Sequence, residues 1–318
     1  MIDVGIDEAG YGPLLGPLVV TGAAFDVPDA ACPPDYWRLL SASISRRTPR
    51  RDSRLTIDDS KRLYTSAAGI AALERAALVV LHTVGTAPAT LRGLLDAVAD
   101  PPPDLDAHPW YRGFDAALPV AGDARSIALN AHAVACDMKG AQITPHRIIC
   151  TVITEGEFNR RVAAARNKAV VLAEAALGIA AVLASARKHH RLRVTIDRHG
   201  GRKHYRDSLM TFFEPRHLRI IEETDRASAY ELTDDQGVWS IAFRVQADRE
   251  HMPVALASIY SKYLRELLMR GLNRFFVRHL PGLKPTAGYY RDARRFLCDV
   301  KPVIESQRLD RSMLVRLR

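Results

Sequence analysis

The order of apolar and polar positions along the chain predicts alternating strands and helices. Apolar or β-branched runs over 2–7, 17–25 and 146–154 are typical of strands. Apolar side chains repeat three and four positions apart over 66–81 and 157–188, and a high alanine content there favours helices. This alternation favours an α/β layer architecture.

The second half of the chain continues the pattern. A short strand is expected over 192–197, and two more are expected over 217–223 and 238–246. Pro253 fits the first turn of a helix that would run to about Met269, because the missing N–H of proline has no partner to lose there.

Two proline-rich stretches, 32–56 and 86–145, interrupt the alternation and are interpreted as insertions or lids on the surface. A length of 318 residues suggests about two domains. We therefore divide the chain into an α/β domain over 1–270, which contains both insertions, and a basic C-terminal extension over 271–318.

The composition, with 47% hydrophobic and 25% charged residues, excludes a disordered chain, a collagen and a membrane channel. The most apolar run, 169–184, is interrupted by Glu174 and is too short to span a membrane, so no membrane partner is expected. The acidic N-terminus is unlike a signal peptide, and we expect a cytoplasmic protein. The scattered cysteines predict neither a disulfide framework nor a zinc site: Cys32, Cys136, Cys150 and Cys298.

The net charge is +9, and the last 58 residues carry all of it, with 14 basic and 5 acidic side chains. A concentrated basic region attracts polyanions, most often nucleic acid. The alternative is a solvated surface without a partner, and the charge alone does not separate the two.

Acidic residues close three of the predicted strands. Asp7 and Glu8 end the first strand before a glycine-rich bend, Asp197 ends a later strand, and Asp248 closes an apolar run over 241–247. Ligand sites in open α/β sheets gather at the carboxyl ends of parallel strands. Carboxylates without accompanying histidine or cysteine prefer Mg²⁺ or Mn²⁺ to Zn²⁺. Each acid alone could be a turn or capping residue, whereas the set predicts a metal site.

Five segments, in order along the chain, resemble the type 2 ribonucleases H. Residues 5–20, which begin Gly-Ile-Asp-Glu-Ala-Gly-Tyr-Gly-Pro, resemble the opening motif of that family. Residues 59–63, Asp-Ser-Lys-Arg-Leu, resemble its Asp-Ser-Lys-Lys-Leu element. The other matches are the strand that ends at Asp197, the Gln246-Ala-Asp248 segment with the helix Ser258-Ile-Tyr-Ser-Lys262 after it, and Gly288-Tyr289.

The resemblance implies a ribonuclease H-like fold, in which helices flank a mixed five-stranded sheet and a helical C-terminal extension follows. It implies that Asp7, Glu8, Asp197 and Asp248 are the catalytic ligands of two divalent ions, Mg²⁺ or Mn²⁺. It also implies endonucleolytic cleavage of the RNA strand or embedded ribonucleotides in RNA–DNA duplexes, with 3′-hydroxyl and 5′-phosphate ends. Two such ions can activate a water and stabilise the departing 3′-oxygen, so no side-chain nucleophile is needed.

Further residues are expected to bind the RNA–DNA hybrid or the ribonucleotide-containing duplex. Backbone N–H groups of the glycine-flanked loop could hydrogen-bond a ribose 2′-hydroxyl. The Ser-Lys pair of the second motif is either a phosphate contact or a helix cap with a solvated lysine. Arg202 and Lys203 could hold the scissile strand; this expectation rests on their placement near Asp197 in the sequence and not on the family resemblance. The set is Gly10, Tyr11, Gly12, Ser60, Lys61, Arg202, Lys203, Ser258, Lys262 and Tyr289, and Arg265 could join them.

The chain departs from the family at Tyr11, where arginine or lysine is usual, and at Glu266, where aspartate is common. The separation of 51 positions between Asp197 and Asp248 is also longer than usual. Catalysis is expected because all four acids are present. Two alternatives stay open: a nucleic-acid-binding protein that keeps the fold without efficient turnover, and a nuclease of the same superfamily that cuts DNA junctions.

Overall fold

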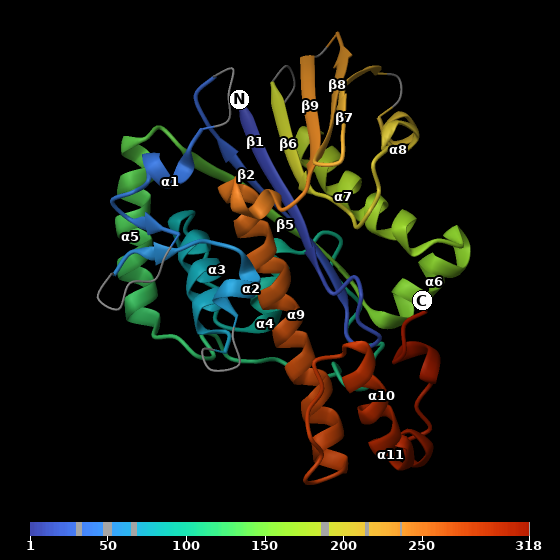
Figure 1. Ribbon diagram of the computed structural model, residues 1–318. Coiled ribbons are helices and arrows are strands. Elements are labelled where there is room, and N and C mark those ends of the chain that lie inside the picture. The colour runs from blue at the N-terminus through green and yellow to red at the C-terminus, as the bar shows by residue number, and fades with distance from the viewer. Residues whose placement is uncertain are drawn as a thin grey trace.

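A mixed sheet with helices on both of its faces forms the centre of the molecule (Figure 1), which confirms the predicted α/β class. The computed structural model describes residues 1–29, 34–46, 53–64, 69–185, 191–213, 216–235 and 237–317. The seven strands lie in the order β5-β2-β1-β6-β9-β8-β7, and β1, β6 and β9 run parallel to one another. Their bounds are Ile2–Ala9 (β1), Leu18–Asp26 (β2), Thr144–Ile153 (β5), Leu192–Asp197 (β6), His217–Glu223 (β7), Ala227–Asp234 (β8) and Gly237–Arg244 (β9).

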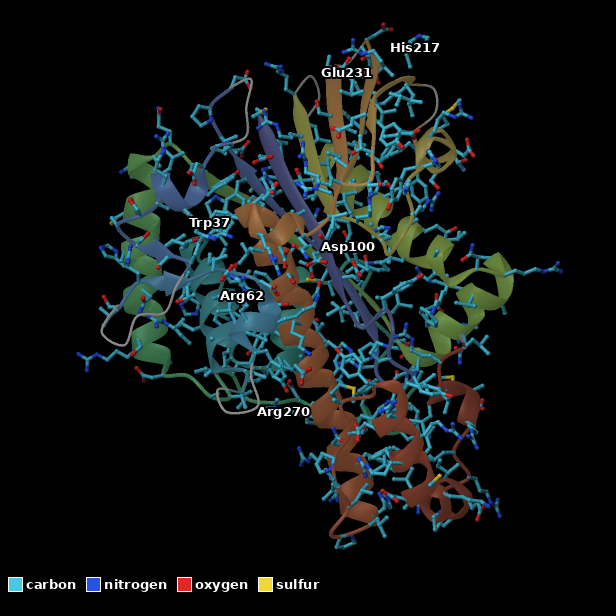
Figure 2. The ribbon with its side chains drawn as sticks, viewed as in Figure 1. Trp37, Arg62, Asp100, His217, Glu231 and Arg270 are labelled. Atoms are coloured by element: carbon cyan, nitrogen blue, oxygen red, sulfur yellow. The ribbon has the colours of Figure 1, made fainter. Side chains whose placement is uncertain are left out.

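The predicted strand number of five is wrong, because β8 and β7 extend the sheet beyond β9. The unexpected strand is β8, which pairs with β9 from Ala227 opposite Arg244 to Asp234 opposite Gly237. Strand β8 is held mainly by backbone hydrogen bonds to its neighbours. It contains few large apolar side chains, so the sequence pattern does not predict it. The β7–β8 hairpin, marked by His217 and Glu231 in Figure 2, accounts for the long separation between the third and fourth acids.

Helix α9 (Met252–His279) packs on one face of the sheet and helix α7 (Lys168–Ser185) on the other. By length and composition α7 could cross a membrane, but ten of its side chains are buried within the protein, as in a core helix. The remaining elements are α1 (Tyr36–Leu39), β3 (Ile44–Ser45), β4 (Leu55–Thr56), α2 (Ser60–Leu63), α3 (Ala71–Thr83), α4 (Leu91–Val98), α5 (Ala124–Gly140), α6 (Glu155–Ala165), α8 (Arg206–Phe212), η1 (Ala247–Arg249), α10 (Tyr290–Asp299), α11 (Lys301–Ser306) and η2 (Arg311–Met313).

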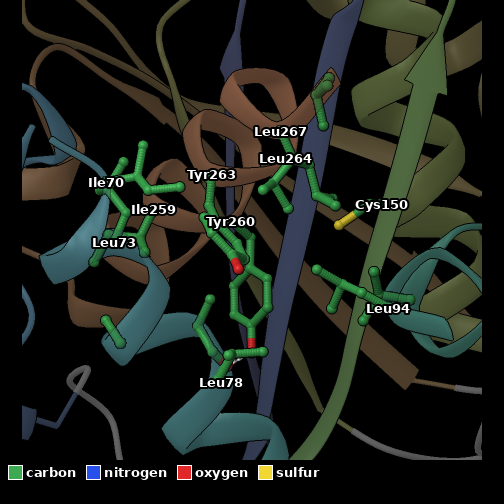
Figure 3. Packing of buried hydrophobic residues seen from close by; sticks show 14 of the residues in the cluster. Ile70, Leu73, Leu78, Leu94, Cys150, Ile259, Tyr260, Tyr263, Leu264 and Leu267 are labelled. Carbon is green, nitrogen blue, oxygen red and sulfur yellow. Dashed lines mark hydrogen bonds between the residues drawn. The ribbon is translucent and has the colours of Figure 1, made fainter. Parts of the chain in front are cut away.

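The stretch 86–145 is not a surface insertion, because much of it lies in the larger hydrophobic cluster. Helices α4 and α5 contribute buried side chains such as Leu94 and Val134, and α3 and α5 pack on each other beside α9. Figure 3 shows Leu94 and Cys150 near Tyr260 and Leu264 of α9. Two of the other three cysteines are exposed, all three described cysteines are free, and Cys32 lies outside the described residues.

Two predicted helix boundaries are also corrected. The helix expected over 157–188 is two helices, α6 and α7, because Arg166 adopts a left-handed conformation with φ of 52° and the Asn167 side chain accepts from the N–H of Ala169. Helix α9 runs ten residues past Met269, since buried Leu272 and Phe276 continue its apolar face. The predicted domain boundary between 270 and 271 therefore falls inside one continuous helix.

The close approach of α9 to β1 depends on Gly5. A β-carbon at this position would lie 2.1 Å from the backbone nitrogen of Val254 and 2.2 Å from the carbonyl carbon of Pro253. Neither backbone atom can move without shifting the start of α9. A hydrogen atom in place of a side chain is therefore what lets the helix lie directly on the strand.

Gly5→Ala should lower the free energy of unfolding by about 3 kcal/mol, because the new methyl group forces α9 away from β1. Gly178→Ala is the matched control, since a β-carbon there meets no atom within 4 Å and alanine favours a helix. Chemical denaturation of both variants measures the difference. Equal stability of the two variants would show that α9 tolerates displacement from the strand.

Candidate active site

The register of the parallel strands places two of the predicted acids side by side. Ile6 of β1 lies opposite Ile196 of β6, so Asp7 and Asp197 follow at neighbouring strand ends. Adjacent strands are about 4.8 Å apart. Asp7 lies on the α9-facing side of β1, opposite the side on which Ile6 is buried in the smaller cluster, and Glu8 follows it.

Asp248 reaches the same place through a turn and not, as predicted, at the end of a strand. Strand β9 stops at Arg244, and Gln246 adopts a left-handed conformation with φ of 57°, which redirects the chain into η1. The N–H of Ala247 donates to Oδ1 of Asp197 at 2.9 Å. This bond ties η1 to the end of β6 and brings Asp248 beside Asp197.

All four acids line one cavity of about 330 Å³. Eight of the ten predicted substrate residues line it too, and they come from the loop after β1, from α2, from α9 and from the segment before α10. These eight are Gly10, Tyr11, Gly12, Ser60, Lys61, Ser258, Lys262 and Tyr289.

Arg202 and Lys203 do not line this cavity. The guanidinium of Arg202 donates to the carbonyl of His204 at 2.9 Å and lies 4.8 Å from the ring centre of Tyr205. Lys203 forms an ion pair with Asp225. Their proximity to Asp197 in sequence is thus not proximity to the acids in space.

Burial and mutual repulsion make the four acids resist ionisation. Burial raises the pKa of Asp7 well above its usual value, and the charges of Glu8 and Asp197 raise it further, while a hydrogen bond from Ser258 lowers it. Burial and Asp197 raise the pKa of Glu8 to about 7. The pKa of Asp197 rises to about 6, mainly through burial, and burial followed by Asp59 raises that of Asp248. A concentration of carboxylates like this one favours a bound cation.

The chemistry of the donors suits a hard divalent cation, since the four acids offer only oxygen ligands. Within the described parts of the chain, however, no three His, Cys, Asp or Glu side chains are already arranged as a metal-binding cluster. The residues present therefore fit Mg²⁺ or Mn²⁺ by charge and donor type.

The two lysines of the cavity are held differently. Lys262 donates to Glu266 at 2.7 Å and lies 4.5 Å from the ring centre of Tyr64, whose hydroxyl also donates to Glu266. Lys61 is exposed, and its ammonium has no ion-pair partner among residues 1–29, 34–46, 53–64 and the other described ranges. Its charge lowers the pKa of Glu8 and Asp197. Of the two lysines, Lys61 is therefore the one whose charge is not paired within the described residues.

Arg265, which the sequence suggested as an addition to the predicted set, lines the cavity as well. Five further lining residues were not predicted: Ala9, Pro13, Asp59, Gln246 and Arg249. Asp59 caps α2 by accepting from the N–H of Lys61 at 2.9 Å, and it is buried. Its place at the head of the Asp-Ser-Lys-Arg-Leu motif was the available signal. The hydroxyls of Ser60 in α2 and Ser258 in α9 hydrogen-bond each other at 2.9 Å, which fixes α2 against α9.

Neither a family model nor a curated protein matches the chain. Solved type 2 ribonuclease H structures match nearly its whole length at low identity. RNase HII of Archaeoglobus fulgidus, solved with PCNA, is 18% identical, with 100% of this chain and 95% of that chain covered and a TM-score of 0.47. Ribonuclease H2 of Pyrococcus horikoshii OT3 is 13% identical, with 99% and 92% covered and a TM-score of 0.48. Bst-RNase HIII, solved with Mn²⁺, is 15% identical, with 99% and 66% covered and a TM-score of 0.44.

The raised pKa values predict that the metal-free protein loses stability as the pH rises from about 5 to 8. In that range the folded protein holds protons on these acids that the unfolded chain has already released, so each rise in pH favours unfolding. Asp7→Asn should raise Tm at pH ~8 by about 3 °C, and by less at pH ~5. Thermal unfolding with a chelator present measures both effects.

The control is Asp235→Asn, which makes the same change of charge at an exposed position. It should leave Tm unchanged at both pH values. A metal-free Tm that climbs with pH would contradict the assignment of repulsion to the four acids.

Proposed function

We propose that the protein is a metal-dependent endonuclease that hydrolyses the RNA strand, or embedded ribonucleotides, of RNA–DNA duplexes and leaves 3′-hydroxyl and 5′-phosphate ends. The observation that carries the proposal is the meeting of Asp7, Glu8, Asp197 and Asp248 in one cavity, beside a lysine without an ion-pair partner among the described residues. Carboxylates alone would repel a phosphodiester. A cation between them would turn the same cavity into a site for one.

Mg²⁺ or Mn²⁺ bound by these carboxylates would supply a nucleophilic water and stabilise charge on the departing oxygen. The protein's own residues do the positioning. Ser258 lowers the pKa of Asp7, the N–H of Ala247 orients Asp197, and Lys61 offers a charge to a phosphate in the cavity. The backbone of the loop after β1 can bind a ribose hydroxyl, the group that separates RNA from DNA.

Binding without turnover is the second candidate, and one observation favours it. The acids are not arranged as a ready metal cluster in the described residues, so a chain of this kind could bind a duplex and cut it poorly. Incubating the wild-type protein with a labelled RNA–DNA hybrid and Mg²⁺ or Mn²⁺ separates the two candidates. Binding without cutting in either metal supports the second.

Asp248→Asn should lower kcat for cleavage of the hybrid at least about 100-fold, because it removes a charged ligand without changing the volume of the side chain. Affinity for the hybrid in Ca²⁺ should stay near that of the wild type. Asp235→Asn, far from the cavity lining, should cut normally. Near-normal cleavage by Asp248→Asn would remove this residue from the site.

Lys61→Gln should weaken duplex binding and flatten its salt dependence by roughly 0.9 log units per log unit of salt, the value for one lost phosphate contact. Lys262→Gln is the matched comparison, because the ammonium of Lys262 already binds Glu266 inside the same cavity. It should change the slope much less. Equal slopes for the two variants, measured by titration at several salt concentrations, would mean that neither lysine contacts phosphate selectively.

A further inference from the structure

The loop between β1 and β2 turns its carbonyl groups toward an arginine from the far end of the chain. The two terminal nitrogens of the Arg316 guanidinium divide between adjacent carbonyls: Nη1 donates to that of Gly10, and Nη2 donates to that of Tyr11 at 3.2 Å. Nη1 also lies 3.5 Å from the carbonyl of Gly16. One planar fork thus bridges the beginning and the end of the loop.

The segment that carries Arg316 is itself tied down. The backbone N–H of Arg316 donates to the carbonyl of Leu14 at 2.9 Å. From α6, the amide of Asn159 donates to the carbonyls of Ser312 and Val315 at 2.6 and 2.8 Å and accepts from the N–H of Leu317 at 2.7 Å. We call residues 311–317 the C-terminal strap.

Burying the charged guanidinium of Arg316 costs free energy, which its contacts must offset. Arg316 is only 3% exposed, and burial together with the charge of Arg265 lowers its pKa to about 9. The ring of Phe158, whose centre lies 3.8 Å from the guanidinium carbon, and the carboxylate of Glu155 offset part of this cost. A lysine would carry the same charge but could not bridge two carbonyls with a rigid fork.

The direction of the carbonyls fixes the direction of the opposite N–H groups. In a trans peptide the C=O and N–H point to opposite sides, and the bonds of this loop are trans. With the carbonyls of Gly10 and Tyr11 on Arg316, the N–H groups of Tyr11 and Gly12 point away from it. Neither N–H has a hydrogen-bond partner in the described part of the chain, and the three residues line the cavity.

We propose that Arg316 is a positioning residue for ribose selection: its fork holds the two peptide units from Gly10 to Gly12 so that their N–H groups are presented to a substrate hydroxyl in the cavity. The ribose-containing substrate in this proposal rests on the proposed function. The role of Arg316 in holding the loop rests on the contacts described above. It extends the site to the C-terminal strap, more than 300 positions from the loop in sequence.

The first test does not require catalysis. Within residues 10–16, the N–H groups of Leu14 and Leu15 donate to the carbonyl of Gly288. Arg316→Lys should speed hydrogen exchange of these two amides at least tenfold, because the ammonium releases one carbonyl of the Gly10–Tyr11 pair and loosens the loop. Exchange in α7 and β6 should be unchanged. Arg311→Lys is the control, since Arg311 lies in the same strap with an exposed side chain. Unaltered exchange over residues 10–16 in Arg316→Lys overturns the proposal.

The second test reads ribose selection. In Ca²⁺, which permits binding without cutting, we expect the wild type and Arg311→Lys to prefer an RNA–DNA hybrid over a DNA duplex of the same sequence. Arg316→Lys should lower this ratio of affinities about tenfold, chiefly by weakening the hybrid. A role in folding alone would weaken both duplexes equally, and that result overturns the proposal.

Two further results keep the test decisive. If Arg316→Lys does not fold, Asn159→Ala keeps the Arg316 side chain but removes the bonds that hold the strap, so the guanidinium is held less firmly. This variant should shift the same two readouts in the same direction. If the wild type shows no preference for the hybrid, the proposed substrate is wrong and ribose selection falls with it. The hydrogen-exchange result would then still decide whether Arg316 anchors the loop.

Discussion

The contact between α9 and β1 at Gly5 is the constraint on which the site depends. Because the start of α9 lies on the backbone of β1, the hydroxyl of Ser261 donates to the carbonyl of Asp7 at 3.0 Å and lies within hydrogen-bond distance, 2.8 Å, of the hydroxyl of Thr21. These bonds fix the helix to the end of the strand. They also determine where Ser258, one turn before Ser261, and Lys262, the residue after it, enter the cavity.

The same packing brings together charges that destabilise the fold. Burial, followed by repulsion between neighbouring carboxylates, raises the pKa values of the four acids at the ends of β1 and β6 and in η1. The fold tolerates this repulsion because α9 and the sheet are anchored by two hydrophobic clusters, one on each face. Stability built elsewhere in the core therefore permits a cluster of charges that by itself destabilises the fold.

The elements with a strong local pattern of apolar residues were predicted from the sequence, whereas those that depend on pairing or packing with distant segments were missed. Strong apolar strands ending in Asp7 and Asp197 were predicted, and their parallel register brings the acids together as expected. The strand β8 and the buried role of α5 were missed, because backbone pairing and helix packing leave only a weak mark on short polar-rich segments. The family resemblance pointed to the residues of the loop after β1 that line the cavity, whereas placement beside an acid in the sequence misled for Arg202.

Arg316 could not have been found from the sequence, and the reason is physical. The loop after β1 needs positive φ at Gly10 and Gly16, so the residues that bend it have no side chains to hold it. Its carbonyls must be satisfied by a group from elsewhere, and a buried arginine can satisfy several at once. A motif rich in glycine is therefore only half of a binding element. The other half is whichever segment the fold lays beneath it, which here is the C-terminal strap.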